Sequence, residues 1–312
     1  MIRWLVVGAG QAGQCHMAAI ANGPASGLAG IVSLESPPGG FQKVYAQVTK
    51  AAADTSPDAV ILATPHDTHV PLALEILDLG LPLLCEKPVG RSADEARQVL
   101  AAGRSASVPV GVVLNQRALV HHRWIRNLIV AGELAPRSIT FSGNLARLSG
   151  WHADAERVGG GLLRVIGLHY LDLLRWWLGE SQTLGAVIGG GASEDRVNVT
   201  LTFGGGATGR LELTAQHDHS IGPVSCIVEA DNARIRLNGH RVTHQEGLPQ
   251  APAPEEDDSA LIFGPGHQAV INEASAALAA GRGFPVTLAD ALPSLALVDR
   301  AYACANQDAS GE

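Results

Sequence analysis

Cysteine is scarce in this sequence, with four residues in a chain of 312. Cys15, Cys85, Cys226 and Cys304 are widely separated, and no two of them form a CxxC pair. This spacing argues against a disulfide framework and gives no metal-ligand pattern, so we predict neither a disulfide nor a metal. Cys85 follows an apolar run, and we expect a small buried residue at a strand end, not a nucleophile.

Long apolar runs and clustered basic residues are also missing. No apolar stretch approaches the roughly 18–20 residues that a bilayer-spanning helix needs, which argues against a membrane protein. The net charge is -8 and the basic residues are scattered, so there is no basic stripe of the kind that binds nucleic acid. The N-terminus lacks the features of a signal peptide, and we expect a cytoplasmic protein that acts on a small molecule.

Short apolar runs alternate with helical segments through the first hundred or so residues, and hydrophobic residues make up 46% of the chain. That content suffices for two domains. Buried strands are expected at residues 2–7, 28–34, 59–63, 82–85 and 109–114. Helices are expected at residues 11–21, 69–79 and 92–102, the last with Ser92 and Glu95 at capping-box spacing. This alternation predicts a parallel, doubly wound sheet.

The pattern changes after about residue 117. Strand-like runs separated by glycine-rich turns fill residues 183–237, after a strand at 137–144 and helices near 123–131 and 167–178. Two more helices are expected near residues 267–280 and 288–305. We therefore predict an α/β protein with a doubly wound domain at 1–117. The second domain, residues 118–312, is α+β with a large, open, mostly antiparallel sheet, and its last helix could pack back on the first domain.

The stretch from Ile2 to Gly13, IRWLVVGAGQAG, predicts a dinucleotide-binding strand, turn and helix. Gly8 allows the tight turn, Gly10 lets the backbone approach a pyrophosphate, and Gly13 lets the helix pack closely on the strand. The helix that begins at Gln11 and Ala12 offers backbone N–H groups to the phosphates.

An acidic residue, Glu35, follows the second expected strand about twenty residues after the last glycine. A carboxylate at this position accepts hydrogen bonds from the ribose hydroxyls, which favours NAD over NADP. No arginine or lysine follows in the Ser-Pro-Pro-Gly-Gly stretch at 36–40 to bind a 2′-phosphate. A solvated loop acid is the alternative interpretation of Glu35.

Further motifs make the sequence resemble the Gfo/Idh/MocA family of NAD(P)-dependent oxidoreductases over nearly its whole length. The motifs are LATPHDTH at 62–69, Glu86-Lys87-Pro88 at the end of LCEKPV, Asn115-Gln116-Arg117, and three glycines at 159–161 followed by Gly167-x-His169-x-x-Asp172. His267 before a helix and Pro285-Val286-Thr287 extend the match. The resemblance implies a Rossmann domain, hydride transfer at a carbon that bears a hydroxyl or carbonyl, and a homodimer or homotetramer.

Oxidation of a secondary alcohol needs a group that takes the hydroxyl proton and a cation that stabilises the developing alkoxide. Lys87 suits either task, because it follows a buried strand at the carboxyl edge of the sheet, where doubly wound folds bind ligands. In relatives the histidine corresponding to His169 helps to handle the substrate proton. We therefore predict Lys87 and His169 as catalytic residues.

The remaining predicted site residues fall into two groups. The cofactor is expected to contact Gly8, Gly10, Gln11, Ala12, Gly13, Glu35, Thr64, Pro65, His69 and Glu86. The substrate is expected to contact Asn115, Arg117, His152 and Asp172. Asp172 could instead orient His169, because the two lie three residues apart on a helix. Arg117 suits a substrate carboxylate or phosphate, or a salt bridge at the domain junction.

Two departures from the family pattern limit the functional prediction. Relatives usually carry an aspartate four residues before the histidine, and this sequence has Val165 there, preceded by Arg164. The stretch between Glu35 and Asp58 is also short, so the helix that flanks the adenine pocket is expected to be shortened or missing.

The leading functional hypothesis is an NAD-dependent dehydrogenase or reductase that acts on a secondary alcohol or ketone of a sugar, amino sugar or cyclitol. The alternative is a dinucleotide-binding protein of the same fold without net redox turnover. Such a protein would be a regulatory sensor or a glycoside-cleaving enzyme that uses NAD transiently. The loss of the aspartate at Val165 is the feature that keeps this alternative open.

Overall fold

The computed structural model describes residues 1–35, 43–191, 193–216, 222–253 and 265–310. Its contacts divide the chain into two compact units. The first unit contains residues 1–118 and 256–293, and the second contains residues 119–255 and 294–312. The first break therefore falls next to the predicted boundary at 117. The contacts also group residues 256–293 with the first unit, although they come late in the sequence.

The first unit is built on a six-stranded sheet in which every paired strand is parallel. The strand order is β3-β2-β1-β4-β5-β6, which is the doubly wound order of dinucleotide-binding sheets. The strands are β1 (Ile2–Val7), β2 (Ser26–Val32), β3 (Val44–Tyr45), β4 (Ala59–Leu62), β5 (Leu83–Glu86) and β6 (Val110–Val113). The predicted parallel α/β sheet is confirmed.

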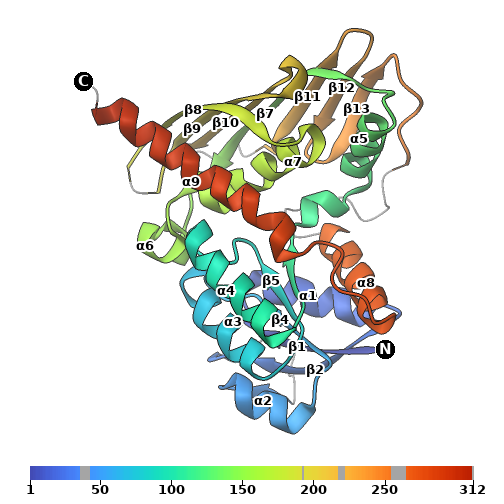
Figure 1. Cartoon of the computed structure of the whole chain (residues 1–312), viewed down its shortest axis with the longest axis vertical. Helices are drawn as coiled ribbons and strands as arrows, with labels where there is room; N and C mark the ends of the chain where they lie inside the picture. Colours follow the sequence, from blue (N-terminus) through green and yellow to red (C-terminus); the bar gives the residue numbers. More distant parts are fainter. Residues whose placement is uncertain (36–42, 192, 217–221, 254–264, 311–312) are drawn as a thin grey trace. The chain divides into compact units, whose positions relative to one another are not determined.

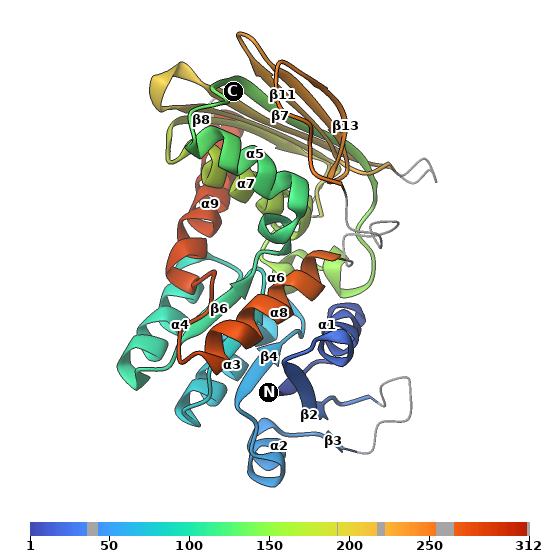
Figure 2. The same cartoon turned by 90° about the vertical axis from the view of Figure 1, so that its right-hand side faces the viewer.

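Helices cover both faces of this sheet, as Figures 1 and 2 show. On one face, α1 (Gln11–Asn22) packs beside α8 (Pro265–Ala279). On the other face, α3 (His69–Asp78) packs between α2 (Val48–Thr55) and α4 (Ala93–Ala106). Because helices bury both faces, β4 is apolar throughout and β5 is apolar up to its last residue, Glu86, and every residue of both strands is buried.

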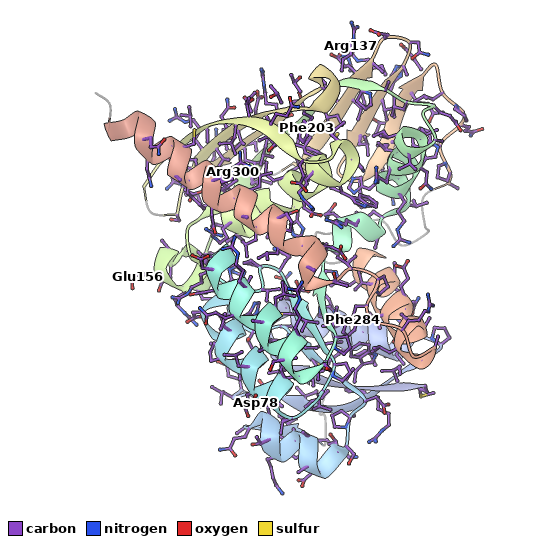
Figure 3. The ribbon with its side chains drawn as sticks, viewed as in Figure 1. Asp78, Arg137, Glu156, Phe203, Phe284 and Arg300 are labelled. Carbon is purple, nitrogen blue, oxygen red and sulfur yellow. The ribbon has the colours of Figure 1, made fainter. Side chains whose placement is uncertain are left out.

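The core between the sheet and α8 includes the fully buried indole of Trp4, which donates a hydrogen bond from Nε1 to Ser275 Oγ at 3.0 Å. Phe284, labelled in Figure 3, lies over Gly111 of β6, where an added Cβ would come within 2.5 Å of its ring. These contacts explain why a late segment of the chain joins the first unit.

Between Glu35 and Asp58 the structure has a two-residue strand, β3, and an eight-residue helix, α2. A helix is therefore present in the described part of this stretch. The Ser-Pro-Pro-Gly-Gly stretch at 36–40 lies outside the described residues.

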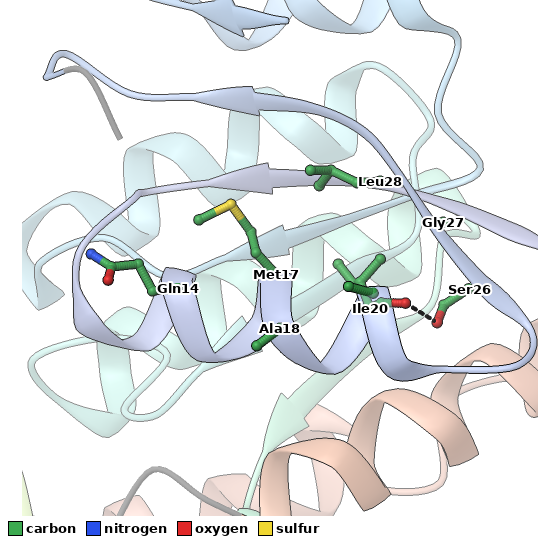
Figure 4. Close-up of a pocket in the computed structure, with 8 residues that line it drawn as sticks. Gln14, Met17, Ala18, Ile20, Ser26, Gly27 and Leu28 are labelled. Carbon is green, nitrogen blue, oxygen red and sulfur yellow. Dashed lines mark hydrogen bonds between the residues drawn. The ribbon is translucent and has the colours of Figure 1, made fainter. Parts of the chain in front are cut away.

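A shallow groove lies along the flank formed by α1 and β2, shown in Figure 4. Met17, Ile20 and Leu28 supply its apolar lining, and Ser26 Oγ donates a hydrogen bond to the Ile20 carbonyl beside it. None of the residues that line this groove belongs to the predicted site.

The second unit is built on a seven-stranded sheet with the order β13-β12-β11-β7-β10-β9-β8. Only β7 and β10 pair in parallel, so the predicted, mostly antiparallel sheet is confirmed. The strands are β7 (Pro136–Ala146), β8 (Ser181–Gly189), β9 (Arg196–Phe203), β10 (Thr208–Gln216), β11 (Ser225–Ala230), β12 (Arg234–Asn238) and β13 (Arg241–Glu246). β13 is not predicted from the sequence, because its residues RVTHQE lack an apolar pattern, and none of them is buried.

One face of the second sheet is buried and the other is polar. Along β10, Leu211, Leu213 and Ala215 are buried, whereas Arg210 and Thr214 on the opposite face are exposed. The helices α5 (Val120–Val130), α7 (Leu168–Leu178) and α9 (Leu288–Ser310) lie against the same face, as seen in Figures 1 and 2. No helix in the described parts of the chain covers the polar face. None of the described helices combines the length and the apolar character that a bilayer span requires.

The cap of α4 provides a test of these local rules. Ser92 Oγ accepts a hydrogen bond from the Glu95 amide at 3.2 Å, as the capping spacing predicts. We expect Ser92→Ala to lower the free energy of unfolding by about 1 kcal/mol, because the first turn loses its acceptor. Ser105→Ala, at an exposed position in the same helix, is the control and should be close to neutral. Equal effects of the two variants on the free energy of unfolding in urea would contradict the assignment of Ser92 as the N-cap residue of α4.

Candidate active site

The glycine turn begins where β1 ends. Gly8 has φ +102°, a conformation that residues with a Cβ rarely adopt. An added Cβ at Gly8 would lie 2.3 Å from the Ala63 carbonyl oxygen and 3.0 Å from Thr64 Cγ2. The turn therefore lies directly against the end of β4, and only glycine fits there.

Gly10 and Gly13 have different surroundings. An added Cβ at Gly13 would meet the Gly8 carbonyl oxygen at 2.0 Å, so Gly13 lets α1 pack closely on the turn. Gly10 caps α1 and has no atom within 4 Å of an added Cβ. The helix has no side-chain cap and no acidic residue in its first turn. An open helix N-terminus of this kind fits a dinucleotide pyrophosphate.

The loop after β4 is held by its own side chains. Thr68 Oγ1 donates to Thr64 Oγ1 at 2.7 Å, and Pro65 precedes the short helical turn His66–Thr68. The His69 side chain is fully buried, with Nε2 2.7 Å from the Thr64 carbonyl and Nδ1 2.7 Å from the Pro88 carbonyl. His69 therefore ties the loop after β4 to the loop after β5. Its predicted role was a contact with the cofactor, but both ring nitrogens face backbone oxygens of this unit.

Glu86 is the last residue of β5, and its side chain is buried. Its Oε1 lies 2.7 Å from His16 Nε2 and 3.2 Å from His267 Nε2. Its Oε2 accepts a hydrogen bond from the Lys87 amide at 3.2 Å. Glu86 was predicted to contact the cofactor, yet its carboxylate is engaged by α1, by α8 and by the next residue.

The pKa values of several ionisable groups in this region are shifted from their usual values. Burial would raise the pKa of Glu86, but the hydrogen bonds from His16 and His267 outweigh it and hold that pKa well below the usual range. Burial lowers the pKa of Lys87, while the neighbouring Glu86 carboxylate raises it. Burial also lowers the pKa of His16 and of His69. A carboxylate is therefore kept ionised in the core, next to a lysine whose ammonium is destabilised.

Cys85 precedes this pair and is fully buried, as predicted. Burial raises the pKa of its thiol well above the usual value, so the group is not an activated nucleophile.

The donor atoms of His16, Glu86 and His267 lie within 4.8 Å of one another. They form the group of described residues whose spacing could hold a metal ion, although the sequence predicted no metal.

The other predicted residues of the first unit are more dispersed. Glu35 is exposed beyond the end of β2, and its amide donates a hydrogen bond to Ser33 Oγ at 3.2 Å. Asn115 and Arg117 are buried in a short helical turn, Asn115–Ala118, that follows β6. The first turn of α8 packs against it, because an added Cβ at Gly266 would lie 2.7 Å from the Asn115 carbonyl oxygen.

In the second unit, Val165 is buried within a π-helical turn, Leu163–Gly167, that leads into α7. Arg164 is also buried, and it donates hydrogen bonds to the Gly159 carbonyl at 2.6 Å and to Asp299 at 2.8 Å. The Arg164 side chain therefore joins the glycine segment to α9. It does not replace the aspartate that relatives carry, because its charge is opposite and already paired.

His169 is buried on the first turn of α7. Asp172 is buried one turn later, where its Oδ1 accepts a hydrogen bond from Ser294 Oγ at 2.6 Å. His152 is half-buried and stacks on the neighbouring Trp151 with ring centroids 3.8 Å apart. The second unit thus contributes its own group of predicted residues, separate in the chain from the Lys87 group.

The first unit brings Gly8, Thr64, His69, Glu86 and Lys87 to the carboxyl ends of neighbouring strands. His16 is a further residue of this group that the sequence does not predict. The signal available was a histidine on the buried side of α1, in line with Gly13, Met17 and Ile20. Its pairing with Glu86 could not be predicted, because it depends on tertiary packing that brings a side chain of α1 to the end of β5.

With this geometry established, comparison with known proteins identifies the class. The family model described as "Oxidoreductase family, NAD-binding Rossmann fold" matches residues 2–114, and the Gfo/Idh/MocA C-terminal domain model matches residues 122–240. Together the matches cover well over half of the chain. The protein belongs to the Gfo/Idh/MocA family, and its first unit is the family's NAD-binding Rossmann domain.

Individual relatives are more distant. The chain is 31% identical over 193 residues to the rhizopine catabolism protein MocA of Rhizobium meliloti, covering 57% of each chain. It is 28% identical over 184 residues to 1,5-anhydro-D-fructose reductase of Ensifer adhaerens, covering 57% of this chain and 55% of that protein. The matches thus span little more than half the length of these curated relatives.

Solved structures show the same fold over nearly the full length. The WlbA dehydrogenase of Bordetella pertussis, solved with NADH and UDP-GlcNAcA, superposes with a TM-score of 0.84. The alignment covers 98% of this chain and 96% of that one at 22% sequence identity.

The glycines offer a test of the cofactor site. Gly13→Ala should lower the free energy of unfolding by about 1–3 kcal/mol, because its Cβ would clash with the Gly8 carbonyl. Gly10→Ala should leave stability nearly unchanged, since its Cβ meets open space, but should weaken NADH binding measured by fluorescence titration. Unchanged NADH affinity in Gly10→Ala would contradict a pyrophosphate at this position.

Proposed function

We propose that this protein is an NAD-dependent oxidoreductase acting on a secondary alcohol or ketone of a sugar, amino sugar or cyclitol. The observation that carries the proposal is the placement of Lys87. It follows β5 at the same edge of the sheet as the glycine turn, and burial lowers its pKa. The relative named 1,5-anhydro-D-fructose reductase supports the substrate class.

When bound, the nicotinamide would accept or supply the hydride. The pyrophosphate would be held by Gly8, Gly10, Gln11, Ala12 and Gly13. The Glu35 carboxylate would accept hydrogen bonds from the ribose hydroxyls. Thr64 and Pro65 would border the nicotinamide side. These roles follow from the turn geometry and from the acceptor chemistry of a carboxylate.

Lys87 would take the hydroxyl proton on its Nζ in the oxidation direction and return it in the reduction direction. A lysine with a lowered pKa suits this task, because a lower pKa increases the neutral fraction of the side chain at any given pH. We propose His169 as the second proton-handling group. Asn115, Arg117, His152 and Asp172 would bind the polar groups of the substrate.

A second candidate function is dinucleotide binding without net redox turnover. The observation that favours it is Val165, which puts a buried apolar side chain where relatives carry an aspartate. Tight NADH binding together with no change in nicotinamide absorbance across a panel of sugars and cyclitols would favour this candidate.

We also propose a cytoplasmic homodimer or homotetramer that uses the polar face of the second sheet as its interface. The support is that no described helix covers this face, while its strands alternate regularly between buried and exposed residues.

Replacement of Lys87 tests the enzyme hypothesis. Lys87→Met should lower kcat by about a hundredfold or more, because the proton acceptor is lost, while the Kd for NADH stays within about threefold. Lys50→Met is the matched control, since Lys50 is exposed on α2 and pairs with Asp54. A Lys87→Met enzyme with full turnover would rule out the assigned role.

The pH dependence gives a separate test. The base must be neutral to accept a proton, so kcat/KM for alcohol oxidation should rise as pH rises through the pKa of Lys87. That pKa should lie below the usual lysine value, because burial lowers it. The sequence contains three lysines, Lys43, Lys50 and Lys87, so NMR of protein labelled at lysine Cε can follow each one. A Lys87 resonance that titrates together with that of Lys43 would contradict the prediction.

A further inference from the structure

The buried cluster of Glu86, His16 and His267 has no role in the function proposed above. The three side chains come from β5, α1 and α8, which are distant in sequence. His16 is fully buried, and His267 and Glu86 are nearly so. A buried charge is costly unless it is paired and hydrogen-bonded, so the arrangement requires an explanation.

The distances describe hydrogen bonds to a single oxygen. Both imidazole Nε2 atoms point at Glu86 Oε1, at 2.7 Å and 3.2 Å. Ligand atoms around a tetrahedral metal at about 2.0–2.1 Å would lie about 3.3 Å apart. The shorter contact is therefore a hydrogen-bond distance, and the geometry favours two N–H donors to a carboxylate over a metal site.

The position of the proton on each imidazole follows from its hydrogen bond to the Glu86 carboxylate. A carboxylate whose pKa is held low only accepts hydrogen bonds, so each ring must carry its proton on Nε2. A neutral imidazole has one proton, which leaves Nδ1 as an acceptor. Among the described residues no hydrogen-bond partner is found for His16 Nδ1, which suits a bare acceptor better than a second N–H. The two rings also pack edge to face, with centroids 5.0 Å apart.

The remaining carboxylate oxygen binds the main chain of the proposed catalytic residue. Glu86 Oε2 accepts a hydrogen bond from the Lys87 amide at 3.2 Å. Burial lowers the pKa of the Lys87 side chain, and the Glu86 charge opposes that lowering. The two histidines thus hold the Glu86 carboxylate in place. The carboxylate in turn holds the backbone of Lys87 and places a negative charge beside the Lys87 side chain.

We propose that His16 and His267 are positioning residues that act on Lys87 through the Glu86 carboxylate. The inference rests on the proposed function for its kinetic readout only. The ionisation of Lys87 can be followed by NMR whether or not a substrate is known.

The test uses paired substitutions that keep or remove the donor at the Nε2 position. A glutamine amide nitrogen reaches about as far as Nε2, whereas an asparagine amide reaches only the Nδ1 position. In the full-length protein we expect His267→Asn to lower kcat at least tenfold, with KM and the NADH Kd within about threefold of wild type. His267→Gln should recover most of the rate, and the same order should hold for His16→Asn and His16→Gln.

NMR of lysine labelled at Cε provides the second readout. His267→Asn should change the pKa of Lys87 by at least about half a unit and leave Lys43 and Lys50 unchanged. His121→Asn is the control, because His121 is a buried histidine of the second unit that binds the Pro252 carbonyl and the Val242 amide. It should lower the melting temperature without changing kcat or the Lys87 resonance.

Two results would overturn the proposal. One is a set of His16 and His267 variants that lose stability but keep both the wild-type kcat and the wild-type Lys87 titration. The other is a stoichiometric metal ion in the purified wild-type protein by elemental analysis. If the wild type turns over no sugar or cyclitol, the proposed function fails, but a shifted Lys87 titration in His267→Asn still supports the positioning role.

Discussion

The buried carboxylate of Glu86 is the interaction on which the first unit depends. It ends a central strand, and it accepts hydrogen bonds from helices on either side of it in sequence and from the residue that follows. Removing any one donor leaves a charge in an apolar core with fewer partners, which is costly. Strand, helix and loop positions at this edge of the sheet are therefore coupled through a single side chain.

Much of this architecture could be predicted from residue patterns, because local rules and tertiary packing agree there. The apolar runs of β1, β4 and β5 mark strands buried on both faces, and Gly8 and Gly13 mark a turn that only glycine can form. The polar strand β13 was missed for the opposite reason. Its pairing with β12 stabilises it without burying its side chains, so no periodicity marks it.

The candidate site was predicted less completely than the fold. Motifs indicated that Glu86 and His69 matter, but not that their polar atoms face the protein interior. That distinction depends on which helix packs beside which strand end, and no local pattern encodes it. His16 could not be predicted, because a lone histidine on a helix resembles an ordinary core residue. Its partner, Glu86, lies 70 positions away in the sequence.

The late position of α8 in the sequence has a consequence for synthesis. His267 lies 181 positions after Glu86, so the first unit cannot complete its buried network until most of the chain has left the ribosome. Until α8 has been synthesised, the Glu86 carboxylate lacks the hydrogen bond from His267, and the face of the first sheet that α8 covers remains exposed. A chain cut after the first 118 residues would keep the glycine turn but lack this closing segment. In this fold, the unit that begins the sequence is completed only by residues near its end.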